Sequence, residues 1–252
     1  MKLISLNIWG GKLFEPLINF VDGCAHETNI FCFQEMHHVT AHGTVNKGTT
    51  SLFSEISGHL SGFRGIFAPT NKVESSEKER VETWNGLALF IRKPIKVISH
   101  GDVVIHKPAA TIEDPEHKSI PRNLQYVIFK NGGRKYLLCH FHGIWYPKTK
   151  VDTPERIEQS KKIRNFLDSY RCRKILCGDF NLLPKTGSIE ILETGMRNMV
   201  TDFKIKTTRN IHYTREEKHA DYVLVTPDIK VKAFSVLDDV VSDHLPLFLE
   251  FE

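Results

Sequence analysis

The chain has 252 residues, of which 40% are hydrophobic and 25% are charged, a composition typical of a soluble globular protein with a sizeable core. The formal net charge of +4 is small, so it permits a polyanionic partner without requiring one. The longest apolar stretches, such as residues 86–91, have the length of a strand, which excludes a transmembrane helix.

The cysteines and the N-terminus indicate where the protein resides. Five cysteines, an odd number, lie mostly in apolar runs, so we expect free, buried thiols in a reducing compartment. The apolar run at the N-terminus stops at Gly10-Gly11, too soon for the hydrophobic segment of a signal peptide. We therefore expect a cytoplasmic protein, and we expect it to be monomeric.

In the first half of the chain the apolar pattern predicts five strands and two helices. Leu13, Leu17 and Val21 recur at helical spacing, whereas the polar and charged run over residues 72–85 is typical of a mobile surface loop. The predicted strands cover residues 3–9, 30–35, 63–68, 86–92 and 95–105, and the predicted helices cover residues 12–25 and a segment around 52–60.

The second half opens with a hairpin signal, since Asn131-Gly132-Gly133 separates two strand-like runs. Thr153-Pro154 reads as the N-cap and first residue of a helix. The predicted strands are 124–130, 135–142, 174–177, 221–226, 229–236 and 245–251. Strands outnumber helices and several pair as hairpins, which favours two packed sheets with outer helices over a doubly wound parallel sheet. No linker or repeat divides the chain, so we expect a single domain over residues 1–252.

Polar residues gather at the ends of the predicted buried strands. The six places are Asn7, Gln34-Glu35, His140-Phe141-His142, Gly178-Asp179-Phe180-Asn181, Asp221 and Ser242-Asp243-His244. A carboxylate at the end of an apolar strand needs a metal, a cation or hydrogen-bond donors, because its burial without a partner is costly. Glu35, Asp179 and Asp243 offer hard oxygen ligands that suit Mg²⁺ or Mn²⁺ rather than zinc.

The remaining members of this set complete a hydrolytic site. Asn7 and Asn181 supply amide donors and acceptors that hold a ligand without adding negative charge. His142 and His244 can exchange protons or donate to phosphate, and Asp221 can hold one imidazole in the useful tautomer. Together these residues predict metal-assisted hydrolysis of a phosphate ester.

Five of these motifs, Leu-Asn-Ile-Trp-Gly, Gln-Glu, a strand ending in His, Gly-Asp-Phe-Asn and Ser-Asp-His-Leu-Pro, occur in a characteristic order. In this order the chain resembles the endonuclease/exonuclease/phosphatase superfamily, which includes DNase I, abasic endonucleases, inositol polyphosphate 5-phosphatases, neutral sphingomyelinases, deadenylases and tyrosyl-DNA phosphodiesterases. The resemblance runs over residues 3–251. It implies a DNase I-like α+β fold, a four-layered α/β sandwich with two mixed β-sheets face to face and helices outside. It also implies dependence on Mg²⁺, with Mn²⁺ as a substitute.

The resemblance also implies a role for each residue of the site. Glu35 is the main metal ligand, with Asn7 and Asp243 close to the metal. Asp179 and Asn181 position the attacking water and the scissile phosphate. The other implied roles concern the catalytic pair His244 and Asp221, the phosphate donor His142, and Arg122, which stands where many members carry a phosphate-side arginine. Whether Asp179 or His244 takes the proton of the water stays open.

The substrate stays open too. We favour a phosphodiester in DNA or RNA, with an endonuclease, exonuclease or tyrosyl-DNA phosphodiesterase-like activity. The alternatives are a phosphomonoesterase or sphingomyelinase-like phospholipase acting on an inositol, sugar or lipid phosphate, and an inactive binding module.

The histidines near Cys139 and at positions 37, 38 and 42 lack a second ligand pair at zinc-finger spacing. His140 competes with His142, which we favour because it ends the strand. We interpret Trp9 as a core residue, whereas Trp84 and Trp145-Tyr146, in predicted loops near the site, are either core residues or stacking platforms for a base or headgroup.

Overall fold

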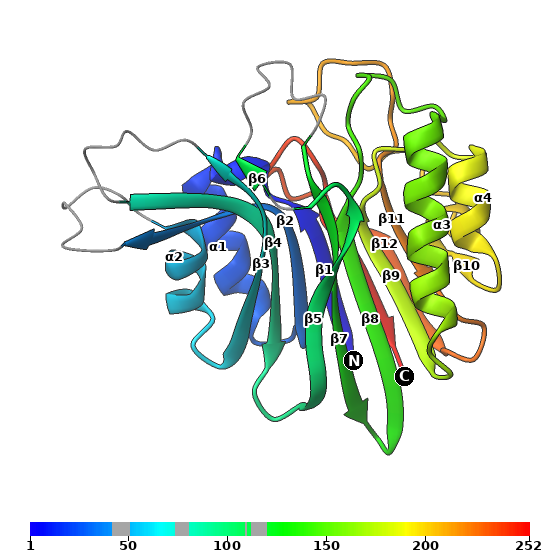
Figure 1. Cartoon of the computed structure of the whole chain (residues 1–252). Helices are drawn as coiled ribbons and strands as arrows, with labels where there is room; N and C mark the ends of the chain where they lie inside the picture. Colours follow the sequence, from blue (N-terminus) through cyan, green and yellow to red (C-terminus); the bar gives the residue numbers. More distant parts are fainter. Residues whose placement is uncertain (42–50, 74–80, 109, 112–119) are drawn as a thin grey trace.

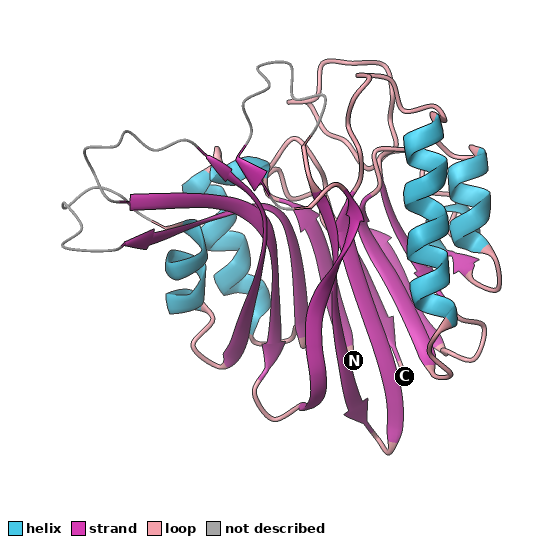
Figure 2. Cartoon of the chain, in the orientation of Figure 1, coloured by secondary structure: helices cyan, strands magenta, loops and turns pink. Residues whose placement is uncertain are grey.

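The structure is a computed structural model that describes residues 1–41, 51–73, 81–108, 110–111 and 120–252. The chain folds into two β-sheets that lie face to face (Figures 1 and 2). The larger sheet has the order β12 (Val231–Val236), β13 (Leu247–Phe251), β1 (Lys2–Asn7), β2 (Ile30–Ala41), β4 (Val81–Arg92), β3 (Phe63–Val73) and β6 (Ala110–Thr111). The smaller sheet has the order β10 (Arg197–Asn198), β11 (Asp221–Val225), β9 (Arg173–Asp179), β8 (Arg134–His142), β7 (Arg122–Asn131) and β5 (Lys96–His106). Both sheets are mixed, because β1 pairs parallel with β2 and β8 pairs parallel with β9 among antiparallel neighbours.

Helices lie on the outer faces of the two sheets, as Figure 2 shows. The larger sheet carries α1 (Phe14–Ala25) and α2 (Leu52–His59), and the smaller sheet carries α3 (Pro154–Asp168) and α4 (Gly187–Glu193). Two short elements complete the described part of the chain, the 3₁₀ turn η1 (Trp9–Gly11) and α5 (Met199–Asp202). The four-layered sandwich predicted from the sequence is confirmed.

Side chains on β1 and β2 alternate between two cores. Ile4 and Phe31 pack with α1 and α2, whereas Leu3 and Ile30 pack between the sheets. Because successive side chains of a strand point to opposite faces, Asn7 shares the inner face of β1 with Leu3. The same alternation that builds the core therefore delivers a polar side chain to the space between the sheets at the end of β1.

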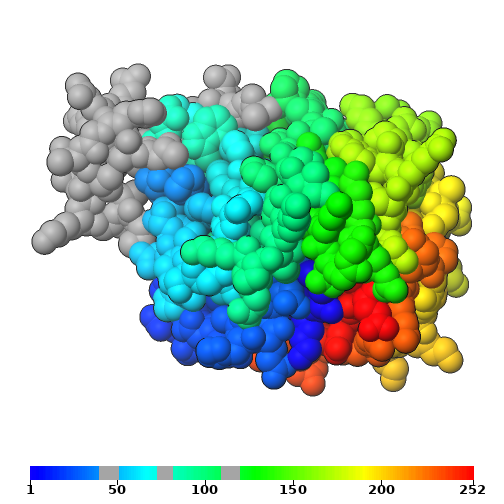
Figure 3. Space-filling view, turned by 90° about the horizontal axis from the view of Figure 1, so that it is seen from below, coloured from blue at the N-terminus to red at the C-terminus, as the bar shows by residue number. Residues whose placement is uncertain are grey.

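The termini lie together at the end of the sandwich away from these polar strand ends. The terminal amine of Met1 donates to the carbonyl of Phe251, and the first and last segments lie side by side in Figure 3. β1, β8 and β9 all run from that end to their final residues Asn7, His142 and Asp179, so these residues reach the same edge of the molecule (Figure 1).

The predicted surface loop over residues 72–85 is wrong at both of its ends. β3 continues to Val73 and β4 begins at Val81, with Lys72 opposite Trp84 in the ladder. A cross-strand ion pair of 2.5 Å between Lys72 and Glu82 joins the strands where the sequence pattern shows only charge. The rest of that prediction, residues 74–80, lies outside the described residues.

The predicted start of α3 and the predicted hairpin are confirmed. Thr153 caps α3 by accepting from the backbone N–H of Arg156, and Pro154 is the first helical residue. The Asn131-Gly132-Gly133 turn joins β7 to β8. In the part of the chain that the structure describes, no helix is long and apolar enough to cross a membrane. All five cysteines are free.

A glycine in β9 allows the end of this strand to approach the neighbouring strand β8 closely. Gly178 has φ +130°, and a Cβ at this position would lie 2.2 Å from the carbonyl oxygen of Phe141. No other residue fits such an approach without a shift of the backbone. The next residue is Asp179, so this contact fixes where that carboxylate emerges.

We expect Gly178→Ala to lower the free energy of unfolding by roughly 3 kcal/mol or more, because it adds both backbone strain and a steric clash. The matched control is Gly23→Ala, which places a Cβ in open space within α1 and should raise the free energy of unfolding by about 0.5–1 kcal/mol. Chemical denaturation of both variants measures these changes. A Gly178→Ala protein as stable as the parent would contradict the close approach.

Candidate active site

All nine residues that the sequence predicts for the site come together at one edge of the sandwich. Seven of them line one cavity of about 1120 Å³: Glu35, Arg122, His142, Asp179, Asn181, Asp243 and His244. Asn7 and Asp221 join them through hydrogen bonds to Asp179 and His244 respectively. The set therefore combines the ends of strands from both sheets.

Glu35 reaches the cavity because β2 is irregular at this point. The register of β2 against β4 shifts between Phe33 and Met36, and Glu35 has φ +58°. A β-bulge of this kind turns one side chain away from the regular pleat, and a left-handed conformation is uncommon for glutamate. The side chain of Glu35 keeps 37% of its surface exposed to the cavity, so its carboxylate is accessible to a ligand.

Asn7 links two carboxylates from different sheets. Its amide Nδ2 donates to Glu35 Oε1 at 2.9 Å and to Asp179 Oδ2 at 3.1 Å, and its Oδ1 accepts from the backbone N–H of Trp9 at 3.0 Å. In this arrangement the amide nitrogen of Asn7 donates to Glu35 and so orients the carboxylate of Glu35. A role as a direct metal ligand through Oδ1 would require rotation of the amide.

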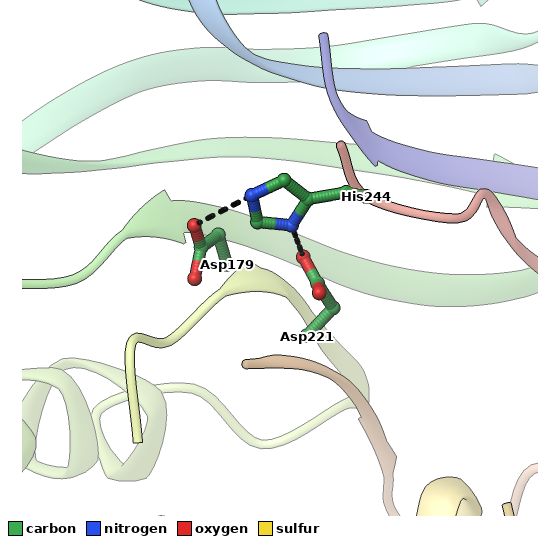
Figure 4. A group of neighbouring side chains, drawn as sticks. All are labelled: Asp179, Asp221 and His244. Carbon is green, nitrogen blue, oxygen red and sulfur yellow. Dashed lines mark hydrogen bonds and ion pairs between the residues drawn. The ribbon is translucent and has the colours of Figure 1, made fainter. Parts of the chain in front are cut away.

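His244 lies between two aspartates (Figure 4). Its Nδ1 is 2.8 Å from Asp221 Oδ1, and Asp221 Oδ2 accepts from the hydroxyl of Thr208 at 2.7 Å. Its Nε2 faces Asp179 Oδ2 at 3.5 Å. Burial alone would lower the pKa of His244, but the carboxylates of Asp221 and Asp179 outweigh it and raise the pKa above the ordinary histidine value. The imidazole is thus held in a fixed orientation with Nε2 toward the cavity.

Asp179 is the acid on which these contacts converge. Its Oδ1 accepts from the backbone N–H of Asn181 at 2.9 Å, while His142 Nε2 lies 3.6 Å from Oδ2. Burial alone would raise the pKa of Asp179, but His244, His142 and nearby basic groups hold it well below its usual range. Asp179 is therefore ionised throughout the physiological pH range.

The two histidines of β8 have different surroundings. His140 is fully buried between Gln125 and Gln34, and burial lowers its pKa to about 3. His142 lines the cavity, and burial together with the charge of Arg122 holds its pKa well below the ordinary value. A neutral His142 still offers one N–H to a ligand, whereas His140 is part of the inter-sheet packing.

Arg122 opens β7 and lines the cavity. Burial lowers its pKa to about 10, against the opposing effect of the nearby carboxylates Glu35 and Asp179. It stays charged at neutral pH, as a phosphate-binding arginine must.

The sequence patterns miss two basic residues of the site, Arg209 and Lys150. Arg209 Nη1 donates to Asp243 Oδ2 at 2.9 Å and contacts His244 Nε2, and its Nη2 lies 3.9 Å from Asp179 Oδ2. Lys150 lines the same cavity and is buried. Both stand in loops without periodicity. The only signal is their place next to motifs, Lys150 after the His142 strand and Arg209 before the Asp221 strand.

The acids of the cavity offer oxygen ligands of the kind that hard divalent cations prefer. Glu35, Asp179 and Asp243 present carboxylate oxygens to one space, and no thiol is among the residues that line it in the described chain. Asp179, Asp221 and His244 also lie close enough to hold an ion. In this second group, Asp221 and His244 Nδ1 already bond to each other, and Thr208 occupies the second oxygen of Asp221. Among the described residues, Asp179, Asp221 and His244 are the one group of His, Cys, Asp or Glu side chains close enough to hold a metal ion. The described histidines near Cys139 therefore form no zinc site, and His42 lies outside the described residues.

A sandwich of two mixed sheets that gathers acids, amides and a histidine–aspartate pair at one edge defines a phosphoesterase of the hydrolase class. The chain belongs to the Endonuclease/Exonuclease/phosphatase family, whose model matches residues 4–244. Members of this family generally depend on a divalent metal. The resemblance inferred from five short motifs is confirmed.

Solved structures with the same fold cover the whole chain. The mannosyl-6-phosphatase Bt3783 of Bacteroides thetaiotaomicron VPI-5482 has a TM-score of 0.73 and 16% identity, with 100% of this chain and 99% of that chain covered. A D. rerio TDP2 humanized by 14 mutations has a TM-score of 0.72 and 12% identity, with 100% and 98% covered. The human Nocturnin catalytic domain with bound sulfate anion has a TM-score of 0.67 and 19% identity, with 100% and 93% covered. Comparison with curated proteins gives no match.

The histidine–aspartate pair predicts a shift in pH dependence. Asp221→Asn removes a carboxylate that raises the pKa of His244, so the pKa of His244 should fall and the corresponding limb of the kcat/KM profile should move to lower pH. Profiles of both proteins at fixed metal concentration measure the shift, and NMR titration of the histidine ring signals checks it without turnover. Superimposable profiles and titrations would show that Asp221 does not tune His244.

Proposed function

We propose that the chain hydrolyses a phosphodiester in nucleic acid, with Mg²⁺ as the preferred metal. The observation that carries this choice is a pairing of rings and cations around the cavity. Lys12 Nζ lies 4.1 Å from the ring of Trp9, Arg209 lies 4.2 Å from the ring of Tyr213, and Lys148 Nζ lies 5.3 Å from the ring of Trp145. Aromatic rings that stack on bases, next to basic groups that follow the backbone, are the usual features of single-strand nucleic-acid binding.

In this proposal each group of residues at the cavity has its own role in the hydrolysis. Glu35 and Asp243, with Asn7 nearby, would hold the metal, which supplies positive charge to the phosphoryl oxygens. Asn181, His142 and Arg122 offer N–H donors to the same oxygens. Asp179 accepts from the attacking water and fixes its direction. Because His244 Nδ1 bonds to Asp221, the lone pair of a neutral His244 lies on Nε2, which faces Asp179 and contacts Arg209 Nη1. Nε2 would take a water proton once Arg209 turns from it to the substrate.

A phosphomonoester is the second candidate. Its support is the fold shared with a protein named mannosyl-6-phosphatase, and a cavity with more basic groups than one diester needs. An inactive binding module is disfavoured, because Glu35, Asp179, Asp221 and His244 are all present and joined by hydrogen bonds or close contacts. Five free thiols are consistent with a reducing compartment such as the cytoplasm.

Metal dependence tests the proposed role of Glu35. Glu35→Gln keeps the shape of the side chain and its bond to Asn7 but removes the charge, so activity should fall by roughly a hundredfold or more while the melting temperature stays near that of the parent. Hydrolysis assays across a Mg²⁺ titration, with an excess of EDTA as the zero point, measure this loss. Full turnover in EDTA, or an unimpaired Glu35→Gln enzyme, would contradict a metal site at Glu35.

Salt dependence separates nucleic acid from small substrates. About three phosphate contacts on a single strand predict that affinity falls roughly tenfold to twentyfold between about 50 and 200 mM salt, since each contact releases counterions. An oligonucleotide and a sugar phosphate should be compared with the same protein at both salt concentrations. Hydrolysis of sugar phosphate alone, or oligonucleotide binding that is flat with salt, would favour the phosphomonoester candidate.

A further inference from the structure

Three buried cationic side chains of the cavity wall have a nitrogen without a hydrogen-bond partner. These atoms are Arg122 Nε, Lys150 Nζ and Arg209 Nε, and the residues are 7%, 4% and 6% exposed. Buried donors in folded proteins are almost always paired, so an orphaned one indicates a further partner, which is an ordered water, an ion or a ligand. In the described residues, these are the only Lys or Arg nitrogens in that state, and all three residues line one cavity.

Arg209 has an unused donor edge. Its Nη1 is occupied by Asp243 Oδ2 and by the contact with His244 Nε2. Its Nε has no partner, and Nη2 approaches Asp179 Oδ2 only as an ion pair of 3.9 Å. The Nε and Nη2 side of a guanidinium carries two parallel N–H groups at the spacing of two phosphate oxygens. This edge therefore has the geometry of a phosphate site.

Lys150 and Arg209 both contact the ring of Tyr213. Lys150 Nζ is 4.9 Å from the Tyr213 ring, and Arg209 contacts the same ring at 4.2 Å. Two hydrogen bonds of 2.8 Å to backbone carbonyls fix the loop of Lys150: Leu183 N–H donates to the Lys150 carbonyl, and the side chain of Arg215 donates through Nη1 to the Lys148 carbonyl. Burial, together with the charge of Arg209, lowers the pKa of Lys150 to about 8 although Asp179 opposes the change. Two cations that share one ring and one cavity favour an anionic ligand.

The number of donors exceeds what one phosphate ester needs. Six Lys and Arg residues line the cavity against three carboxylates, and Lys72 is paired with Glu82, which leaves an excess of two positive charges before any metal binds. A phosphodiester carries a single negative charge on two non-bridging oxygens, and Asn181, His142 and Arg122 already face it in the proposed function. Lys150 and the free edge of Arg209 are left for a different group.

We propose that Lys150 and Arg209, both packed on Tyr213, form a subsite for a second phosphate of the substrate, next to the ester that is hydrolysed. This inference rests on the proposed function, in which the second phosphate is the neighbouring one of a nucleic-acid strand. The subsite selects strands or ends that carry adjacent phosphates over an isolated phosphodiester.

Two dinucleotides test the subsite. TpT has one phosphate, and pTpTp has a further phosphate on each side of it. We expect wild-type kcat/KM to be at least about tenfold higher for cleavage of the central phosphodiester of pTpTp, the effect of one or two charge-assisted hydrogen bonds. Lys150→Met and Arg209→Gln should bring this ratio close to one. Arg209→Lys keeps the charge but loses the two-pronged edge, and should recover only part of it. The control is Lys206→Met, which removes an exposed positive charge from the Arg209 loop and should leave the ratio unchanged.

Binding without turnover separates this inference from the proposed function. Calorimetry in EDTA should show pTpTp binding at least about tenfold more tightly than TpT to the wild type, and nearly equal affinities for Lys150→Met. Lys150→Met should unfold at the same or a higher temperature, because it removes a buried charge and keeps the side-chain length. Absence of hydrolysis with this binding difference intact would refute the proposed function alone. Equal affinities in the wild type, or no binding of either, would overturn the subsite.

Discussion

The burial of the Asp179 carboxylate is the constraint on which the rest of this structure depends. A charge between two sheets is tolerated only when donors and cations surround it. Here they come from separate parts of the chain: Asn7 from β1, His142 from β8, and His244 and Arg209 from the C-terminal loops. Folding brings these groups within reach of one oxygen atom, so the fold and the charge balance of the site are formed together.

This constraint explains the irregular backbone around the site. The bulge at Glu35 in β2 and the glycine contact at Gly178 in β9 both depart from regular strand geometry. Each re-aims a carboxylate toward the shared cavity, and each is supported by regular pairing along the rest of its strand. The long ladders away from the site supply the stability that such strained positions require.

Much of this site could be predicted because its residues stand at the ends of apolar strands. The positions of Asn7, His142 and Asp179 follow from strand direction and side-chain alternation, which a sequence displays. Arg209 and Lys150 could not be found in this way, since loops carry no period and their approach depends on how distant segments pack. The outer parts of β3 and β4 were missed for a related reason: the charges of Lys72 and Glu82 look like solvent-exposed loop residues until the strands pair them.

The Arg209–Asp243 ion pair shows why a single substitution that removes one partner of an ion pair in this site is destabilising. Arg209 is buried and the side chain of Asp243 is 14% exposed, so loss of Asp243 leaves a buried guanidinium with less compensation, a change that costs up to about 3–5 kcal/mol in fully buried pairs. Arg209 also contacts His244, and Asp179 depends on both. The groups that give the cavity its chemistry therefore also stabilise one another's charge. A ligand with two phosphates would bring negative charge to Arg209 and Lys150, while a metal would bring positive charge to the carboxylates of the cavity. The mutual pairing seen within the protein is then replaced by pairing with the ligands, with little net change in buried charge.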